Sequence, residues 1–158
     1  MEDVKSHVKY KVFDSLRERD TENVKRLMKA SALSPNIQDS LGCPILIRSI
    51  LLDQRGLVQW LLSEGADVNC REKGTGATPL HYAVLRPFFS TIVNILVENG
   101  ADINAKTSEG QTPFDWAYSN ISDGGASSSM CEFLIKKGAN VSTFKRAMLK
   151  IRKFLHAC

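Results

Sequence analysis

One five-residue phrase recurs along this chain of 158 residues and limits what the chain can fold into. GADVN at 65–69 returns as GADIN at 100–104 and, more loosely, as GANVS at 138–142. A catalytic group is needed once, whereas a phrase repeated at intervals of 35 and 38 residues is typical of a structural unit stacked on copies of itself. We therefore expect a repeat structure.

Each copy of the phrase follows an apolar pattern. The side chains in this pattern are Leu57, Val58, Leu61 and Leu62 before the first copy, Ile92, Val93, Leu96 and Val97 before the second, and Met130, Phe133 and Leu134 before the third. Their spacings of one, three and four residues predict one face of a helix. Gly65, Gly100 and Gly138 then stand where each helix should end in the left-handed conformation, which glycine adopts at least cost.

A second phrase begins another helix in each unit: ATPLHYAVL at 77–85 and QTPFDWAYS at 111–119. Thr78 and Thr112 suit the N-cap position, and the proline that follows each suits the first helical turn. Each period therefore contains a turn, a helix, a tight turn and a second helix. Such a unit exposes apolar surface on both sides and must stack on its neighbours.

At these residues the chain resembles the ankyrin-repeat family, whose unit has about 33 residues and the signature T-P-L-H-x-A. The match is most specific where TPLHYA (78–83) is followed by GADIN, and it is partial at 39–71, where Pro44, Ile45, Leu46 and Ile47 replace the signature. The resemblance implies an all-α solenoid of about four helix–turn–helix units with hairpin-like finger loops. We divide the chain into a degenerate N-terminal capping unit (1–38), repeats at 39–71 and 72–106, a repeat with a loop insertion at 107–142, and a basic C-terminal capping helix at 143–158.

Composition argues against several other classes. The chain has no run of 18 apolar residues, which a membrane-spanning helix needs, and its first residues lack the apolar core of a secretory signal. Its four cysteines lie far apart without a CxxC pair, so we expect reduced thiols and neither a metal site nor a disulfide framework. We therefore expect a cytoplasmic protein, also compatible with the nucleus, that is not secreted and holds no cofactor or metal.

His81 is the strongest candidate for chemistry, and we interpret it as structural. A general base needs a hydrogen-bonded partner and a substrate pocket, and the only other histidines are His7 and His156, near the two ends. Asp115 occupies the equivalent place in the next repeat. We therefore expect no enzyme. The family resemblance also makes Asn69 and Asn104 candidates for hydroxylation, which we do not favour.

The last residues leave two interpretations open. Residues 143–158 carry five basic side chains and no acid, which gives this segment a charge of +5. The rest of the chain carries −1, and the two together give the net charge of +4. Apolar side chains recur at helical spacing in the same run. We favour a cap that covers the last repeat. The alternative is an adaptor whose basic C-terminal helix binds an acidic partner, an anionic membrane or nucleic acid.

The resemblance implies a function without chemistry. Such modules bind, scaffold or sequester another protein through the finger loops and the concave inner-helix face, as inhibitors of the NF-κB-inhibitor type and pathogen effectors do. We expect one protein partner, no small-molecule substrate, neither nucleic acid nor membrane, and a monomer when the chain is alone. The candidate finger residues are Ser40, Leu41, Arg71, Glu72, Lys73, Thr75, Lys106, Thr107, Ser108 and Glu109. The candidate inner-helix residues are Leu51, Leu52, Leu85, Arg86, Ser119 and Asn120, extended by Phe88 and Phe89 in the turn RPFFST.

Overall fold

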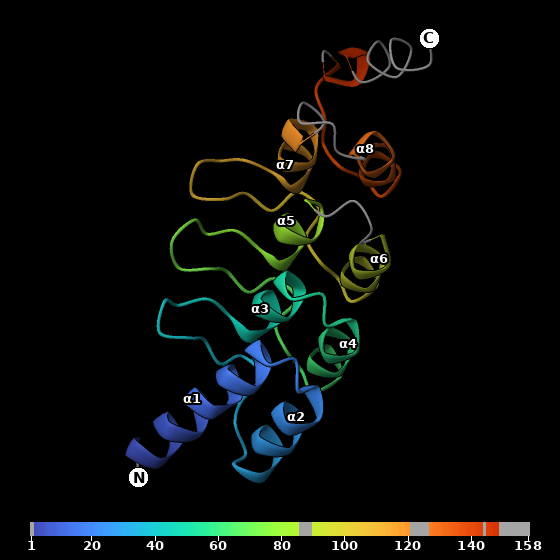
Figure 1. Cartoon of the computed structure of the whole chain (residues 1–158). Coiled ribbons are helices and arrows are strands. Elements are labelled where there is room, and N and C mark those ends of the chain that lie inside the picture. Colours follow the sequence, from blue (N-terminus) through green and yellow to red (C-terminus); the bar gives the residue numbers. More distant parts are fainter. Residues whose placement is uncertain (1, 86–89, 121–126, 144, 149–158) are drawn as a thin grey trace.

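Two rows of short helices stack along one axis, with loops extended from one side (Figure 1). The computed structural model describes residues 2–85, 90–120, 127–143 and 145–148. The inner row contains α1 (Glu2–Arg17), α3 (Ile45–Leu51), α5 (Pro79–Ala83) and α7 (Pro113–Asn120). The outer row contains α2 (Thr21–Ala30), α4 (Arg55–Ser63), α6 (Ser90–Glu98) and α8 (Ser127–Lys136). Within the described ranges no strand forms, and an isolated bridge pairs Gln38 with Pro44.

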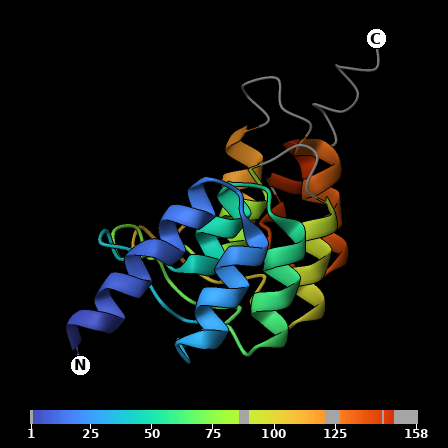
Figure 2. The ribbon, with the colours of Figure 1, turned by 60° about the horizontal axis from the view of Figure 1, so that its bottom comes forward.

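Each outer helix packs beside the inner helix that precedes it, and like helices of successive units stack on one another. Contacts join α3 to α5, α5 to α7 and α4 to α6. Figure 2 shows α1 and α2 side by side at the N-terminal end of the stack, with α1 the longer. The buried side chains form one continuous cluster that runs from Val12 in α1 to Leu134 in α8. The predicted all-α solenoid is thus confirmed.

The glycines of the repeated phrase have the predicted backbone. Gly65, Gly100 and Gly138 have φ angles of 88°, 85° and 100°. An added Cβ would meet no atom within 4 Å at any of them, so each site has room for a larger residue. Glycine is favoured there because of the left-handed backbone conformation alone. Ala32 adopts a φ of 47° in the corresponding place after α2. The segment ALSPN at 32–36 is therefore a further, degenerate copy of the phrase.

The asparagine of each phrase links one unit to the next. Asn69 accepts a hydrogen bond at Oδ1 from Asp102 N (2.8 Å) and donates from Nδ2 to the carbonyl of Gly100 (3.2 Å). Asn104 makes the same pair of bonds one unit later, to the backbone of Asn140 and Gly138. Asn36 begins the ladder by accepting from Asp67 N at 2.7 Å. These amides satisfy backbone groups that would otherwise lack partners.

The second phrase starts its helices as predicted. Pro79 is the first residue of α5, and the backbone N–H of Thr78 donates to His81 Nδ1 (3.2 Å). In α7 the carboxylate of Asp115 takes the place of the imidazole and accepts from Thr112 N at 2.9 Å. Both arrangements are capping boxes, in which the third residue of the helix bonds back to the cap.

The second unit lacks the signature and uses a buried carboxylate in its place. Asp39 accepts hydrogen bonds from Leu41 N (2.9 Å), Cys43 N (3.0 Å) and Arg48 Nε (2.7 Å). Burial alone would raise the pKa of Asp39, but these bonds and the charge of Arg48 outweigh it, so the pKa lies below its ordinary value. The ion pair with Arg48 therefore ties the finger to helix α3.

Three expectations concern residues outside the described ranges. The turn with Phe88 and Phe89 lies at 86–89, and most of the loop insertion lies at 121–126. Of the expected C-terminal capping helix, the structure describes Thr143 and residues 145–148. In that part Lys145 forms an ion pair with Asp115 of α7, which joins the start of the segment to the last repeat.

Candidate interaction face

The fingers lie on the same side of the stack as the inner helices (Figure 1), and most of their predicted residues are exposed. Leu41 is the most prominent apolar side chain among them, with 72% of its surface accessible. A leucine exposed to this degree on a finger is accessible to a partner. The exposed finger residues are Ser40, Leu41, Arg71, Lys73, Thr75, Lys106, Ser108 and Glu109.

Hydrogen bonds between neighbouring fingers hold this side of the molecule rigid. Arg71 Nη1 donates to the carbonyl oxygens of Gly76 (2.8 Å) and Lys106 (2.6 Å). Ser108 N donates to the carbonyl of Thr75 at 2.8 Å. The fingers are thus one connected surface, and little conformational entropy remains to be lost there on binding.

Two of the predicted finger residues are turned inward. Thr107 is buried, with 8% of its surface accessible, so its predicted exposure is wrong. Its hydroxyl accepts a hydrogen bond from Gln111 N (3.2 Å), which closes the base of the finger. Glu72 is half-buried because its carboxylate accepts from Gly74 N (2.8 Å) and Thr75 N (2.7 Å). Both side chains shape their own loops.

The inner helices contribute two hollows to the same face. One, of about 150 Å³, is lined by Phe13, Arg17, Asp39, Arg48, Leu51 and Leu52. The other, of about 390 Å³, is lined by Leu85, Gln111, Trp116, Ser119 and Asn120. The predicted inner-helix residues in the described part of the chain therefore line hollows, whereas Arg86, Phe88 and Phe89 lie outside it.

An aromatic cluster that the repeat pattern did not predict lies beside the larger hollow. The Trp116 ring stands edge-on to the rings of His81 (5.1 Å between centroids) and Tyr82 (5.6 Å). Trp116 Nε1 donates to Gln111 Oε1 at 2.7 Å, which fixes the indole. Tyr82 and Trp116 follow the fourth residue of the signature in successive repeats, at a spacing of 34. This shared position in the repeat could have indicated that the two side chains lie against each other.

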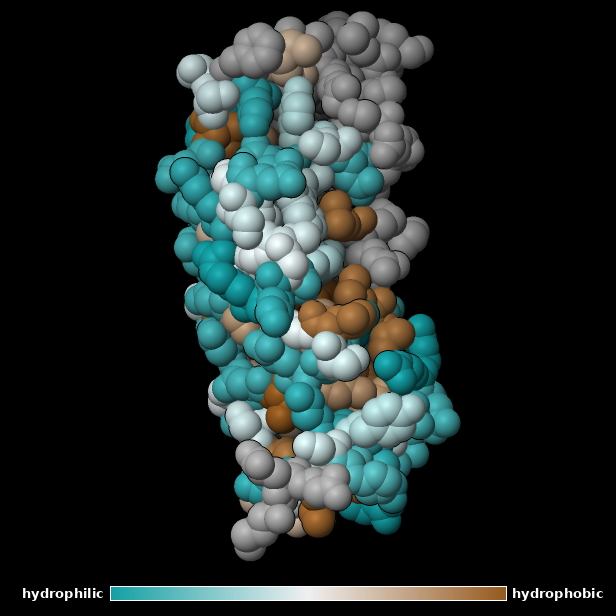
Figure 3. All heavy atoms as spheres, turned by 90° about the vertical axis from the view of Figure 1, so that its left-hand side faces the viewer, coloured by the Kyte–Doolittle hydropathy of each residue, from teal (hydrophilic) through white to brown (hydrophobic). Residues whose placement is uncertain are grey.

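Hydrophilic side chains cover most of the finger side, and hydrophobic ones gather along one edge of it (Figure 3). Leu51, Leu52 and Leu85 are all half-buried, so part of each side chain meets solvent. Apolar groups with a polar surround are the usual composition of a protein interface.

Metal ions and activated cysteine thiols are common components of active sites. The described residues contain no group of three histidine, cysteine or acidic residues that could hold a metal ion. Burial raises the pKa of the Cys43 thiol to about 11 and those of Cys70 and Cys131 to about 12, so these thiols are not activated nucleophiles. In the part of the chain that the structure covers, no helix has the length and apolar character to cross a membrane.

The fold and the row of fingers define a helical repeat protein. The family model for ankyrin repeats, in three copies, matches residues 15–107 and 46–145. The chain therefore belongs to the ankyrin-repeat family. Ankyrin repeats are protein–protein interaction modules and in general are not catalytic, so this chain is a module that binds a protein partner.

Similar proteins carry these repeats in different contexts. The chain is 30% identical over 115 residues to the E3 ubiquitin-protein ligase Ufd4 of Drosophila melanogaster, which covers 72% of this chain and 4% of that protein. It is 32% identical over 102 residues to protein phosphatase 1 regulatory subunit 27 of Mus musculus, and this match covers 65% of each of the two chains. It is 43% identical over 81 residues to mouse ankyrin repeat and SOCS box protein 5, which covers 51% of this chain and 23% of that protein. The matches thus span less than two thirds of the length of each relative.

Proposed function

We propose that the chain binds one protein partner on its finger side, with the two inner-helix hollows at the centre of the contact and the finger tips at its rim. The observation that carries this proposal is the hollow of about 390 Å³ between α5 and α7. It combines an apolar wall, Leu85, with a fixed indole, Trp116, and with the polar side chains of Ser119 and Asn120. Such a site can take an apolar or aromatic anchor from a partner.

The rim supports the same proposal. Arg71, Lys73 and Lys106 place positive charges on the fingers, beside the carboxylates of Glu72 and Glu109. Charges at a rim steer a partner and select it more than they add affinity. We therefore expect a partner surface with an apolar anchor at its centre and charged groups of both signs around it.

Binding without chemistry acts on a partner by covering it or by positioning it. We propose a sequestering or scaffolding role, as the resemblance to inhibitors of the NF-κB-inhibitor type and to pathogen effectors implies. The protein phosphatase 1 regulatory subunit among the relatives is, by its name, a protein that acts through another protein.

The test is capture of partners from cells of the source organism, followed by affinity measurement with the purified partner. Trp116→Ala and Leu85→Ser, made singly, should each weaken binding about tenfold or more, because they remove the walls of the central hollow. Lys136→Ala, at an exposed position on the outer helix α8, is the matched control and should leave affinity unchanged. Thermal melts must show that each variant is folded.

Deletion of residues 149–158 separates this proposal from the alternative. The deletion retains Lys145 and its ion pair with Asp115, so the last repeat keeps that contact. Binding that survives Trp116→Ala and Leu85→Ser but disappears with the deletion would assign recognition to the basic C-terminal segment and would refute a finger-side site.

A further inference from the structure

A hollow of about 280 Å³ lies in the outer row of helices, between the ends of α2 and α4. Its volume is large enough for a side chain of a partner. The lining residues are Met28, Lys29, Ala32, Leu33, Pro35, Trp60 and Glu64.

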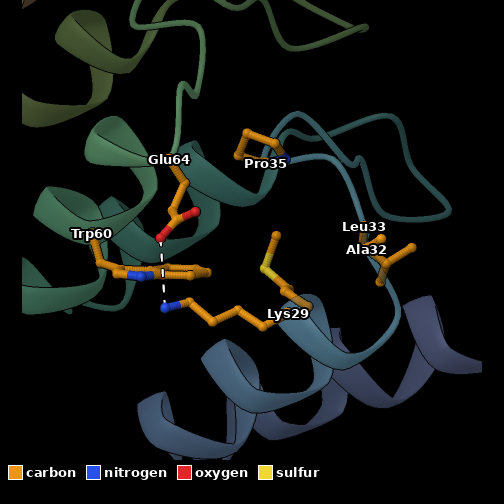
Figure 4. Close-up of a pocket in the computed structure, with 7 residues that line it drawn as sticks. Lys29, Ala32, Leu33, Pro35, Trp60 and Glu64 are labelled. Atoms are coloured by element: carbon orange, nitrogen blue, oxygen red, sulfur yellow. Dashed lines mark ion pairs between the residues drawn. The ribbon is translucent and has the colours of Figure 1, made fainter.

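The chain's own lysine lies in this hollow as a cation would. Lys29 Nζ is 5.8 Å from the centroid of the Trp60 ring and 3.8 Å from Glu64 Oε1. Figure 4 shows the indole of Trp60 extending from α4 into the hollow, with the ion pair between Lys29 and Glu64 close to the ring. An aromatic face together with a carboxylate forms a site for a positive charge.

The backbone favours the same sign of charge. Helix α2 ends at Ala30 and helix α4 ends at Ser63, and each contributes its last residues to the lining. The C-terminal end of a helix carries partial negative charge, which attracts cations near its last turn. The negative ends of two helices and the carboxylate of Glu64 therefore line the hollow, and Lys29 is the cation that lies among them.

That internal cation is held weakly. The side chains of Lys29 and Glu64 are 65% and 42% exposed, and exposed ion pairs add little to stability. Lysine is also a flexible, strongly hydrated point charge. A cation from outside that fits the ring and the carboxylate better can displace it at small cost.

We propose that this hollow receives an arginine side chain of a protein partner, with the guanidinium stacked on Trp60 and paired with Glu64, while Lys29 moves out into solvent. A guanidinium is planar, stacks on aromatic faces and bonds a carboxylate through two N–H groups at once, which an ammonium does not. Met28, Leu33 and Pro35 supply apolar contacts for the arginine stem. This surface belongs to the outer helices and is separate from the finger-side face.

The test uses the peptide acetyl-Gly-Arg-Gly-amide as the probe. Its matched control contains citrulline, which has nearly the same shape as arginine without the charge. The chain has two tryptophans, Trp60 and Trp116, so two indole N–H resonances report on the two faces separately. The arginine peptide should shift the Trp60 resonance in a saturable way that weakens with salt. It should leave Trp116 unmoved, and the citrulline peptide should shift neither.

Two substitutions should act in opposite directions. Glu64→Gln should weaken binding of the arginine peptide about threefold or more, because it removes the carboxylate. Lys29→Ala should strengthen binding by about the same factor, because it removes the competing cation. A merely structural role for Lys29 predicts no such gain. Lys137→Ala is the matched control: Lys137 lies over the Phe133 ring in α8, 5.6 Å from its centroid. This control should change nothing at Trp60.

Equal binding of the citrulline peptide, absence of a saturable Trp60 shift, or weaker binding to Lys29→Ala would each overturn the proposal. A parallel titration with acetyl-Gly-Glu-Gly-amide addresses an acidic occupant that would bind Lys29, and a Trp60 shift with that peptide alone would likewise reject an arginine site. Neither result bears on the finger-side proposal, whose variants lie on other helices.

Discussion

The Nε2 atom of His81 lies 3.1 Å from the carbonyl oxygen of Gln111, at the base of the next finger. The other ring nitrogen, Nδ1, accepts the backbone N–H of Thr78, so the ring hydrogen is on Nε2 and is donated to Gln111. The imidazole is fully buried and joins two repeats. Both nitrogens are engaged in the fold, which supports the structural interpretation of this residue.

His81 should make stability depend on pH in a predictable direction. Burial lowers the pKa of His81 below its ordinary value of 6.5, and the bond to Gln111 opposes this only in part. The unfolded chain therefore binds a proton at a higher pH than the folded chain, and stability falls as pH drops from about 6.5 toward the folded pKa. Urea unfolding at about pH 5.5 should show up to about 1 kcal/mol less stability than at pH 7.5 from this group.

The control for this prediction is the variant His81→Gln, whose side chain takes up no proton in this range. It should flatten the pH dependence between about pH 7.5 and 5.5. The pKa values of Asp39 and Asp115 are both lowered from 3.8, so these carboxyl groups titrate below this window. A wild-type profile without any fall toward pH 5.5 would contradict a buried neutral imidazole.

Asp115 should contribute more stability than its partner Lys145. Its carboxylate accepts from Thr112 N (2.9 Å) at the start of α7 and also pairs with Lys145. Asp115→Ala removes both contacts and should cost about 1–2 kcal/mol. Lys145→Ala removes only an ion pair whose side chains are 41% and 27% exposed, and should cost about 0.5 kcal/mol. If urea unfolding gives the same loss of stability for both variants, the hydrogen bond from Thr112 N to Asp115 adds nothing to the stability of the fold.

The sequence predicts the repeat well because the same physical requirement recurs in each copy. The glycine of each phrase must have a positive φ, and the threonine and proline of the signature begin a helix wherever they occur. Periodicity therefore located α4, α6 and α8 before the repeated phrases and α5 and α7 at the signature, without any knowledge of long-range contacts.

Contacts between units were beyond such reasoning. The clustering of Tyr82 and Trp116 depends on how two repeats stack, whereas the burial of Thr107 accompanies a local bond from Gln111 within the same finger. The degenerate phrase at 32–36 was missed because alanine, serine and proline replace the marker residues, although Asn36 was still in register with Asn69 at a spacing of 33. A repeat cannot be recognised by its period where the residues that mark it differ from copy to copy.

The degenerate phrase can be improved by one substitution. Ala32 has a φ of 47°, a conformation that costs a residue with a Cβ roughly 1–2 kcal/mol. Ala32→Gly should therefore stabilise the fold by about 0.5–1 kcal/mol, once the greater freedom of glycine in the unfolded chain is subtracted. The reverse change, Gly65→Ala, should destabilise by a similar amount, because an added Cβ there meets no atom within 4 Å and only the backbone is strained. Opposite signs in thermal melts are the expected result.

The strongest single dependence should be on Asp39. Its side chain is only 8% exposed, and it accepts from two backbone N–H groups as well as from Arg48. Asp39→Ala leaves these donors without their acceptor and should cost about 2–3 kcal/mol. Asp39→Asn keeps an oxygen for the turn and loses the charge, so it should cost less, about 1–2 kcal/mol. Both values are free energies of unfolding from urea titration.

Asp39, like His81, should make the fold less stable as pH falls, but for a different reason: the fold favours the charged form of Asp39 and the neutral form of His81. Because the pKa of Asp39 is lowered below 3.8, the ionised carboxylate stabilises the fold above that pH, and its contribution is lost as pH falls through the folded pKa. Asp39→Asn should remove this acid-sensitive part. The matched control is Asp53→Asn, since Asp53 pairs with Arg55 at 3.2 Å with both side chains more than 40% exposed. That control should cost under about 0.5 kcal/mol. If the two asparagine variants lose equal stability, the partly buried pair with Arg48 does not hold the second unit together in place of the missing signature.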